Sequence, residues 1–145
     1  AHGCVSAGHP GGYMYVDWNG KVSPCAFVPY SPVDIHDAYA RGKTLINIWA
    51  DPFFAKLRRW QSEYSNENEY TKGSRYGNLM MPCPIRDHYD EFFKILQEHR
   101  PEPVDENARE AMLDPDYRRG MIDYNRALSD LFEPIWKTKY MKGQD

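Results

Sequence analysis

The amino-acid sequence predicts an α+β fold in which a small antiparallel β-hairpin or sheet is followed by three or four α-helices. Two observations predict this order. Near the start of the chain, alternating side chains and an Asn-Gly pair indicate a hairpin. From Asp51 onward, apolar residues recur at spacings of three and four, which indicates amphipathic helices.

The hairpin is predicted over residues 12–27. Asn19 and Gly20 both tolerate the positive φ angles of a type I′ turn, and side chains alternate on the strand before them. In a two-residue turn of this kind, Trp18 faces Lys21 across the hairpin.

Counting outward from that turn places Met14 opposite Cys25. Pro24 has no amide hydrogen, so the return strand is expected to lie at a sheet edge or to end near this residue. Residues 28–50 are rich in turn-forming residues and are expected to form an irregular connection, with a short helix possible within it.

The first clear helix is predicted to begin near Asp51, a good N-cap, with Pro52 at its first position. Residues 62–77 are polar and poorly periodic, so they are expected to form a surface loop. The apolar face of the helix comprises Phe53, Leu57, Trp60 and Tyr64.

Cys83 lies between Pro82 and Pro84, where the backbone cannot form regular helix. A second helix is expected after this turn, and the Arg100-Pro101-Glu102-Pro103 segment breaks it. Its apolar stripe comprises Ile85, Tyr89, Phe92 and Leu96.

A short helix is expected over residues 105–113, and a last helix from Asp114-Pro115. Pro134 is expected to kink or end this last helix. Its apolar residues in register are Tyr117, Met121, Tyr124, Leu128, Leu131 and Ile135.

Composition excludes several classes of protein. The hydrophobic share of 41% and the aromatic share of 14% exceed those of a disordered segment. The net charge of −3 argues against nucleic-acid binding. No stretch approaches the roughly 18 apolar residues of a membrane span, and no signal peptide is evident, so a cytoplasmic location is expected.

The three cysteines, Cys4, Cys25 and Cys83, are an odd number, which weakens a disulfide framework. They can be inert core residues, as most scattered cysteines are, reactive thiols, or ligands of a metal or cluster. Zinc fits less well because there is no C-x2-C pair and structural zinc takes four ligands. A hairpin between two cysteines can bring their thiolates together, and three thiolates leave one iron of a cluster open.

The segments around the first two cysteines resemble the start of the SPASM/Twitch domain of radical S-adenosylmethionine proteins. The resemblance rests on Gly3 to Gly8, on the hairpin, and on Ser23 to Pro29. The family shows a Cys, a spacer, a Gly, four residues and a second Cys. Cys4, Gly20 and Cys25 fit this pattern at the upper limit of the spacer.

Two later motifs extend the resemblance to roughly residues 3–100. Residues 48–54, with Arg58 beyond them, are similar to the family's tryptophan-containing stretch. Residues 81–85 look like the Pro-Cys-Pro motif that follows in one group of these proteins. The order of the three motifs makes the resemblance specific.

The resemblance implies that Cys4, Cys25 and Cys83 ligate one auxiliary [4Fe–4S] cluster. Full SPASM domains carry a further cysteine run for a second cluster, and that run is missing here, so the chain is nearer the Twitch type. The fourth iron would bind a substrate group, water, a residue from outside the chain, or His9, Asp17 or His88.

The C-x3-C-x2-C signature that binds the S-adenosylmethionine cluster does not occur, so no catalytic activity is expected from this chain alone. The resemblance implies an N-terminal barrel of the same polypeptide as partner, with S-adenosylmethionine and its own cluster there. The chain opens at Ala1 without an initiator Met, which agrees with a cut inside a longer polypeptide, although a processed N-terminus would also explain it.

One domain is therefore expected over residues 1–145, with a hairpin and connection in 1–50, helices around Cys83 in 51–100 and a helical extension in 101–145. Its expected function is to assist a radical enzyme by electron transfer or substrate anchoring, with the substrate unidentified. The alternatives are a cluster-free interaction or substrate-lid module and a zinc or thiol-redox domain. Four aromatic residues are candidates for a substrate channel or for core and interface positions: Tyr13, Tyr15, Trp18 and Tyr30.

Overall fold

The computed structural model describes Cys4, residues 12–65 and residues 77–141. The strands in these ranges are β1 (Tyr15–Val16), β2 (Lys21–Ser23), β3 (Tyr30–Ser31), β4 (Val33–Asp34) and β5 (Glu102–Pro103). The helices are α1 (Ile35–Ala40), α2 (Leu45–Trp49), α3 (Pro52–Ser65), α4 (Pro84–Asp87), α5 (Tyr89–His99), α6 (Glu106–Leu113) and α7 (Pro115–Lys139).

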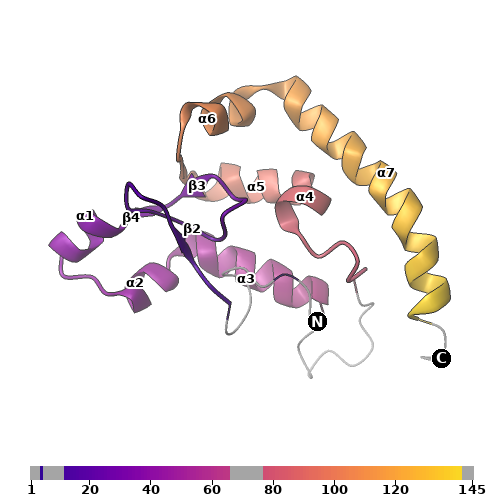
Figure 1. Ribbon diagram of the computed structural model, residues 1–145, viewed down its shortest axis with the longest axis horizontal. Helices are drawn as coiled ribbons and strands as arrows, with labels where there is room; N and C mark the ends of the chain where they lie inside the picture. Colours follow the sequence, from indigo (N-terminus) through magenta and orange to yellow (C-terminus); the bar gives the residue numbers. More distant parts are fainter. Residues whose placement is uncertain (1–3, 5–11, 66–76, 142–145) are drawn as a thin grey trace.

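Small antiparallel sheets precede most of the helical part of the chain, so the predicted α+β class is confirmed (Figure 1). In the described residues β2 lies between β1 and β4, while β3 pairs with β5 from much later in the chain. The central strand β2 ends at Ser23, immediately before Pro24, as the missing amide hydrogen of proline requires.

The register of the hairpin differs by one residue from the prediction. Tyr15 pairs with Ser23, so the turn is a three-residue loop closed by Asp17 and Lys21, and the predicted two-residue turn is wrong. Gly20 has φ of 84° and donates its N–H to the Asp17 carbonyl at 3.0 Å, which is typical of a type I turn followed by a left-handed residue.

The Asp17 side chain explains this choice of turn. Its Oδ1 accepts the backbone N–H groups of Asn19 at 2.9 Å and Lys21 at 2.8 Å, so it satisfies two donors inside the loop. Continuing the observed register outward places Tyr13, rather than Met14, opposite Cys25.

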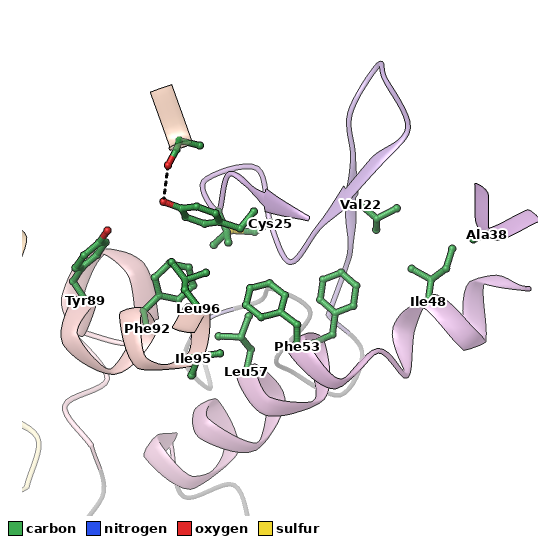
Figure 2. Packing of buried hydrophobic residues seen from close by; sticks show 14 residues of the cluster. Val22, Cys25, Ala38, Ile48, Phe53, Leu57, Tyr89, Phe92, Ile95 and Leu96 are labelled. Atoms are coloured by element: carbon green, nitrogen blue, oxygen red, sulfur yellow. Dashed lines mark hydrogen bonds between the residues drawn. The ribbon is translucent and has the colours of Figure 1, made fainter. Parts of the chain in front are cut away.

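The hydrophobic core lies between the sheets and the antiparallel pair of helices α3 and α5 (Figure 2). Tyr30 is buried in it and donates its hydroxyl to the carbonyl of Ala108 at 3.2 Å, which ties β3 to α6. The largest apolar side chains of the core are Tyr30, Ile48, Phe53, Phe54, Leu57, Tyr89, Phe92 and Leu96.

Helix α3 begins where the sequence predicts it. The Asp51 carboxylate accepts the N–H of Phe53 at 2.9 Å, and Pro52 occupies the first position. The helix continues to Ser65, so the loop predicted over residues 62–77 is wrong for its first four residues. The part over 66–76 lies outside the described residues.

The helix predicted after Cys83 is divided into α4 and α5. His88 leaves helical geometry with φ of −139° and ψ of 48°. Helix α5 ends at His99, and Arg100 caps it with φ of 48°. The break before Pro101 follows the prediction, because the residue before a proline disfavours helical geometry.

The short helix predicted over residues 105–113 is confirmed as α6. Asp105 caps it, because its carboxylate accepts the N–H of Ala108. Helix α7 runs through Pro134 and does not end there. Pro134 has no N–H to donate to the carbonyl of Asp130, four residues earlier. Both residues are exposed, so water can form a hydrogen bond to that carbonyl.

Helix α7 lies along the outer side of the molecule, and none of its residues is fully buried (Figure 1). It packs against α4, α5 and α6. Among the described residues, no helix combines the length and the apolar character needed to cross a membrane.

Candidate metal centre

Three free thiols form the candidate centre. Cys25 is 7% exposed in the turn after β2, while Cys83 and Cys4 are half-buried. A negative charge on Cys4 contributes to raising the pKa of both Cys25 and Cys83, so Cys4 lies within electrostatic reach of each. Cys4 is thus related electrostatically to both other thiols, and the ligand roles of the three stay a prediction.

Cys25 begins a tight turn that closes with a 3.1 Å hydrogen bond from the N–H of Val28 to the Cys25 carbonyl. Burial raises the pKa of the Cys25 thiol, and the Cys4 charge adds to this increase. The backbone N–H groups of Phe27 and Val28 lower the pKa of the same thiol, because they donate to the sulfur and favour the thiolate.

Cys83 stands at the N-terminus of α4, in extended geometry with φ of −88° and ψ of 120°. Pro84 occupies the first helical position, so the chain turns sharply after the cysteine. Burial raises the pKa of the Cys83 thiol, while the N–H groups of Arg86 and Ile85 lower it by donating to the sulfur. The charges of Cys4 and Asp87 raise the pKa further.

Cys25 and Cys83 share one local arrangement. In each case the sulfur accepts the backbone N–H groups of the residues two and three positions later. We call these two arrangements the amide cradles. Backbone N–H donors favour the thiolate form, and hydrogen bonds to sulfur are one of the factors that set the potential of an iron–sulfur cluster.

Asp87, the last residue of α4, supports the second cradle, and sequence reasoning missed it. Its carboxylate is fully buried, and Oδ2 accepts the N–H of Cys83 at 2.9 Å. The Arg86 guanidinium binds the same carboxylate with two hydrogen bonds of 2.5 and 2.8 Å. The Asn125 amide of α7 donates to the Arg86 carbonyl and accepts the Tyr89 N–H at 2.6 Å, which ties α7 to the cysteine turn.

Tyr13 is one of the four aromatic candidates from the sequence, but its place near the thiols was not predicted. Its side chain is 45% exposed, and burial, then the charges of Cys25 and Cys4, raise the pKa of its hydroxyl. The phenol therefore lies near two of the three sulfurs, as the corrected hairpin register places it. Of the other aromatic candidates, Trp18 is 91% exposed and Tyr30 belongs to the core.

Two of the side chains proposed as the fourth ligand, His88 and Asp17, have other partners in the fold. His88 Nε2 lies 2.7 Å from the Met81 carbonyl, and its ring packs against Trp60 and Tyr64 of α3. Asp17 Oδ1 closes the hairpin turn through two backbone N–H groups. His9 lies outside the described residues.

The donor set fits a cluster better than a single ion. Within the described ranges, no group of three or more His, Cys, Asp or Glu side chains converges closely enough to hold one metal ion. A tetrahedral zinc site needs its donors around one point, whereas a cluster takes each thiolate on a separate iron. The three free thiols are the candidates among the described residues for such separate ligands.

Comparison with known families gives one match. Residues 4–72 match the family model named SPASM and described as an iron–sulfur cluster-binding domain. The match contains Cys4 and Cys25 but ends before Cys83. No curated protein and no solved structure matches the chain.

Proposed function

Because residues 4–72 match the SPASM iron–sulfur cluster-binding domain, we propose that this chain is the auxiliary [4Fe–4S] domain of a radical S-adenosylmethionine enzyme. Cys4, Cys25 and Cys83 are its proposed ligands. The domain assists the enzyme by electron transfer or by anchoring the substrate, and it is not catalytic by itself.

The observation that carries this proposal is the position of Cys83. It lies outside the family match, yet the fold brings it within electrostatic reach of Cys4, which also interacts with Cys25. The matching amide cradles on Cys25 and Cys83 support the same role, because inert core cysteines do not need backbone donors aimed at sulfur.

When bound, a cluster with three protein thiolates exchanges one electron and keeps one iron open for another ligand. The protein supplies the two amide cradles and the buried Asp87 carboxylate, which hold the sulfurs of Cys25 and Cys83 in place. Tyr13 lies within electrostatic reach of Cys25 and Cys4 and is 45% exposed to solvent.

We propose that the radical enzyme's barrel and its substrate approach the cluster from the side of Tyr13 and Phe27. Phe27 follows Cys25 in the turn and is 79% exposed, although it is a large apolar residue. Exposed aromatic residues beside a redox centre are suited to contact with a partner, since their burial there contributes binding free energy.

The test is iron and acid-labile sulfide per chain after anaerobic reconstitution. We expect about four of each in the wild type. Cys25→Ser and Cys83→Ser are each expected to lose most of both. Ala26→Ser is the matched control, because residue 26 is exposed in the same turn and is not a proposed ligand.

A folded chain that retains neither iron nor sulfide would contradict the cluster proposal and favour a cluster-free interaction module. Stoichiometric zinc without sulfide would instead favour a zinc domain. Retention of the full cluster by Cys83→Ser would exclude Cys83 as a ligand while leaving the family match intact.

A further inference from the structure

Helix α7 carries a stripe of exposed residues at the spacing of a coiled-coil seam. Tyr117, Tyr124 and Leu131 follow one another every seven positions, and their side chains are 42%, 47% and 59% exposed. Three further exposed residues alternate with them at steps of three and four along the helix: Gly120, Ala127 and Pro134. Such steps keep all six residues on one side of α7, and we call them the α7 seam. A row of bulky apolar residues on one stripe, unlike apolar residues scattered singly, marks an interaction site.

Gly120 indicates how closely a partner can approach the seam. An added Cβ at Gly120 would meet no described atom within 4 Å, so the space between Tyr117 and Tyr124 is open. Glycine inside a helix is destabilising relative to alanine, and here the fold itself does not use the space of the missing side chain. That space can receive a bulky side chain from a second helix.

The seam is complementary to itself when two copies run antiparallel. In an antiparallel pair, the two alternating positions of one seam face the opposite positions of the other, so bulky residues meet small ones. A parallel pair would instead set bulky residues against bulky ones. A two-fold axis at the middle of the seam gives three kinds of layer, each pairing a bulky residue with a compact residue of the second copy: Tyr124 with Ala127, Leu131 with Gly120, and Tyr117 with Pro134.

The flank of the seam nearest the fold adds apolar surface to this pairing. Met121, Leu128 and Ile135 border the seam there, and all three are half-buried. In the antiparallel pair Leu128 faces its own copy, and Met121 faces Ile135 of the second copy. The apolar surface therefore continues from the seam onto this flank in both copies.

The opposite flank of the seam carries four exposed charged residues: Asp116, Asp123, Asp130 and Lys137. The same pairing sets Asp116 opposite Lys137 and Asp123 opposite Asp130 of the second copy. The outer pairs attract and the central pairs repel, and each effect is small because exposed charges interact weakly. Ion pairs within α7 reduce both effects further: Arg119–Asp116, Arg126–Asp123 and Lys137–Glu133.

We propose that the α7 seam binds a second copy of this chain, as an antiparallel and two-fold symmetric pair of helices. The seam is about 26 Å long from Tyr117 to Pro134. It covers fewer than the roughly three to four heptads that a coiled coil usually needs, so a reversible equilibrium between monomer and dimer is expected. The proposal does not depend on the cluster, because none of the three cysteines lies on α7.

The test is sedimentation equilibrium of the cluster-free chain over a range of concentrations, which gives the dissociation constant of the dimer. Ala127→Glu places a carboxylate beneath Tyr124 of the second copy. It is expected to weaken the dimer at least about tenfold, because each dimer would bury two unpaired charges. Ala55→Glu is the matched control, since residue 55 is exposed on α3 and the same charge is added away from the seam.

Two further variants test the antiparallel register. Asp123→Lys turns both central repulsions into attractions with Asp130, so the dimer is expected to tighten about fivefold. Asp116→Lys sets two like charges opposite Lys137 and is expected to weaken the dimer by a similar factor. Both variants change the net charge equally, so an effect of net charge alone would have the same sign in both.

A chain that stays monomeric at every concentration would overturn the proposal and leave the seam to a helix of another protein. A dimer that Ala127→Glu weakens no more than Ala55→Glu does would overturn it as well. If the two lysine variants shift the dissociation constant in the same direction, the antiparallel pairing is wrong. Circular dichroism checks that each variant is folded. Iron content after reconstitution should be the same in all four variants, which separates a failure of this interface from a failure of the cluster proposal.

Discussion

The backbone N–H of Cys83 donates a 2.9 Å hydrogen bond to Oδ2 of Asp87, whose side chain is fully buried. Asp87→Leu removes this acceptor and leaves a buried N–H without a partner, which costs about 1–3 kcal/mol. We therefore expect urea unfolding of the cluster-free chain to show a loss of that size, with lower iron retention after reconstitution.

Asp87→Asn separates the hydrogen bond from the charge. The amide oxygen can still accept the Cys83 N–H, although the ion pair with Arg86 is lost. A smaller loss of stability than in Asp87→Leu is expected. Equal losses in the two variants would show that the carboxylate charge, and not the hydrogen bond, maintains the turn.

The thiols of Cys25 and Cys83 should react slowly in the folded, cluster-free chain. Burial raises the pKa of both above the ordinary value of 9.0, and the thiolate is the reactive form. Alkylation by iodoacetamide, mapped by peptide mass spectrometry, is expected to be slower than in urea, with a rate that still increases above pH 9. If the alkylation rate of the folded chain levels off at or below pH 9, the pKa of these thiols is not raised and the prediction is wrong.

Burial of His88 makes the stability of the chain depend on pH. Burial lowers the pKa of the folded imidazole below 6.5, so the unfolded chain binds the proton more readily. The stabilisation is complete above pH 6.5 and decreases as the pH falls toward the folded pKa. We expect the melting temperature to decrease between pH 7.5 and 5.5.

His88→Gln is the control for this pH effect. Glutamine can still donate to the Met81 carbonyl but does not titrate, so its melting temperature should change less over the same range. If both proteins lose the same stability, the pH dependence comes from other groups. The comparison uses the chain without a cluster, so that ligand protonation does not contribute to the difference.

Helix boundaries were predictable where one local signal determines them. Asp51 and Pro52 start α3, and Asp105 caps α6, because a side-chain acceptor followed by helical residues needs no tertiary contact. The pairing of β3 with β5 joins Tyr30 to Pro103, and nothing local in either segment indicates it. Such a pairing depends on the tertiary fold, in which Tyr30 of β3 is buried in the core.

The cysteines of the candidate site were predictable as residue types, but their surroundings were not. The amide cradles depend on the turns that follow Cys25 and Cys83, and the ligand roles of these residues remain a prediction. Asp87 gave no signal, because an acid in the first turn of a helix is ordinary. The extent of a single domain over residues 1–145 also remains a prediction.

The hairpin shows how a side chain can override a turn motif. Asn19-Gly20 indicates a two-residue turn, but the Asp17 carboxylate binds two N–H groups that only the longer loop presents to it. A shift of one residue exchanges the faces of a strand, so Tyr13 takes the position beside Cys25.

Gly20 is expected to maintain this register, and its replacement by alanine should lower the free energy of unfolding. It has φ of 84°, and an added Cβ would lie 2.6 Å from Cδ2 of His36 and 3.1 Å from Cγ2 of Ile35. Gly42 has φ of 71° but open space around the added atom. Gly42→Ala is therefore expected to cost about 1–2 kcal/mol from the backbone alone, and Gly20→Ala more than that, because a clash is added. Urea unfolding measures the loss of stability in both variants. Equal losses would mean that His36 moves away from the added Cβ at no cost. The close approach of Gly20 to α1 would then not stabilise the hairpin.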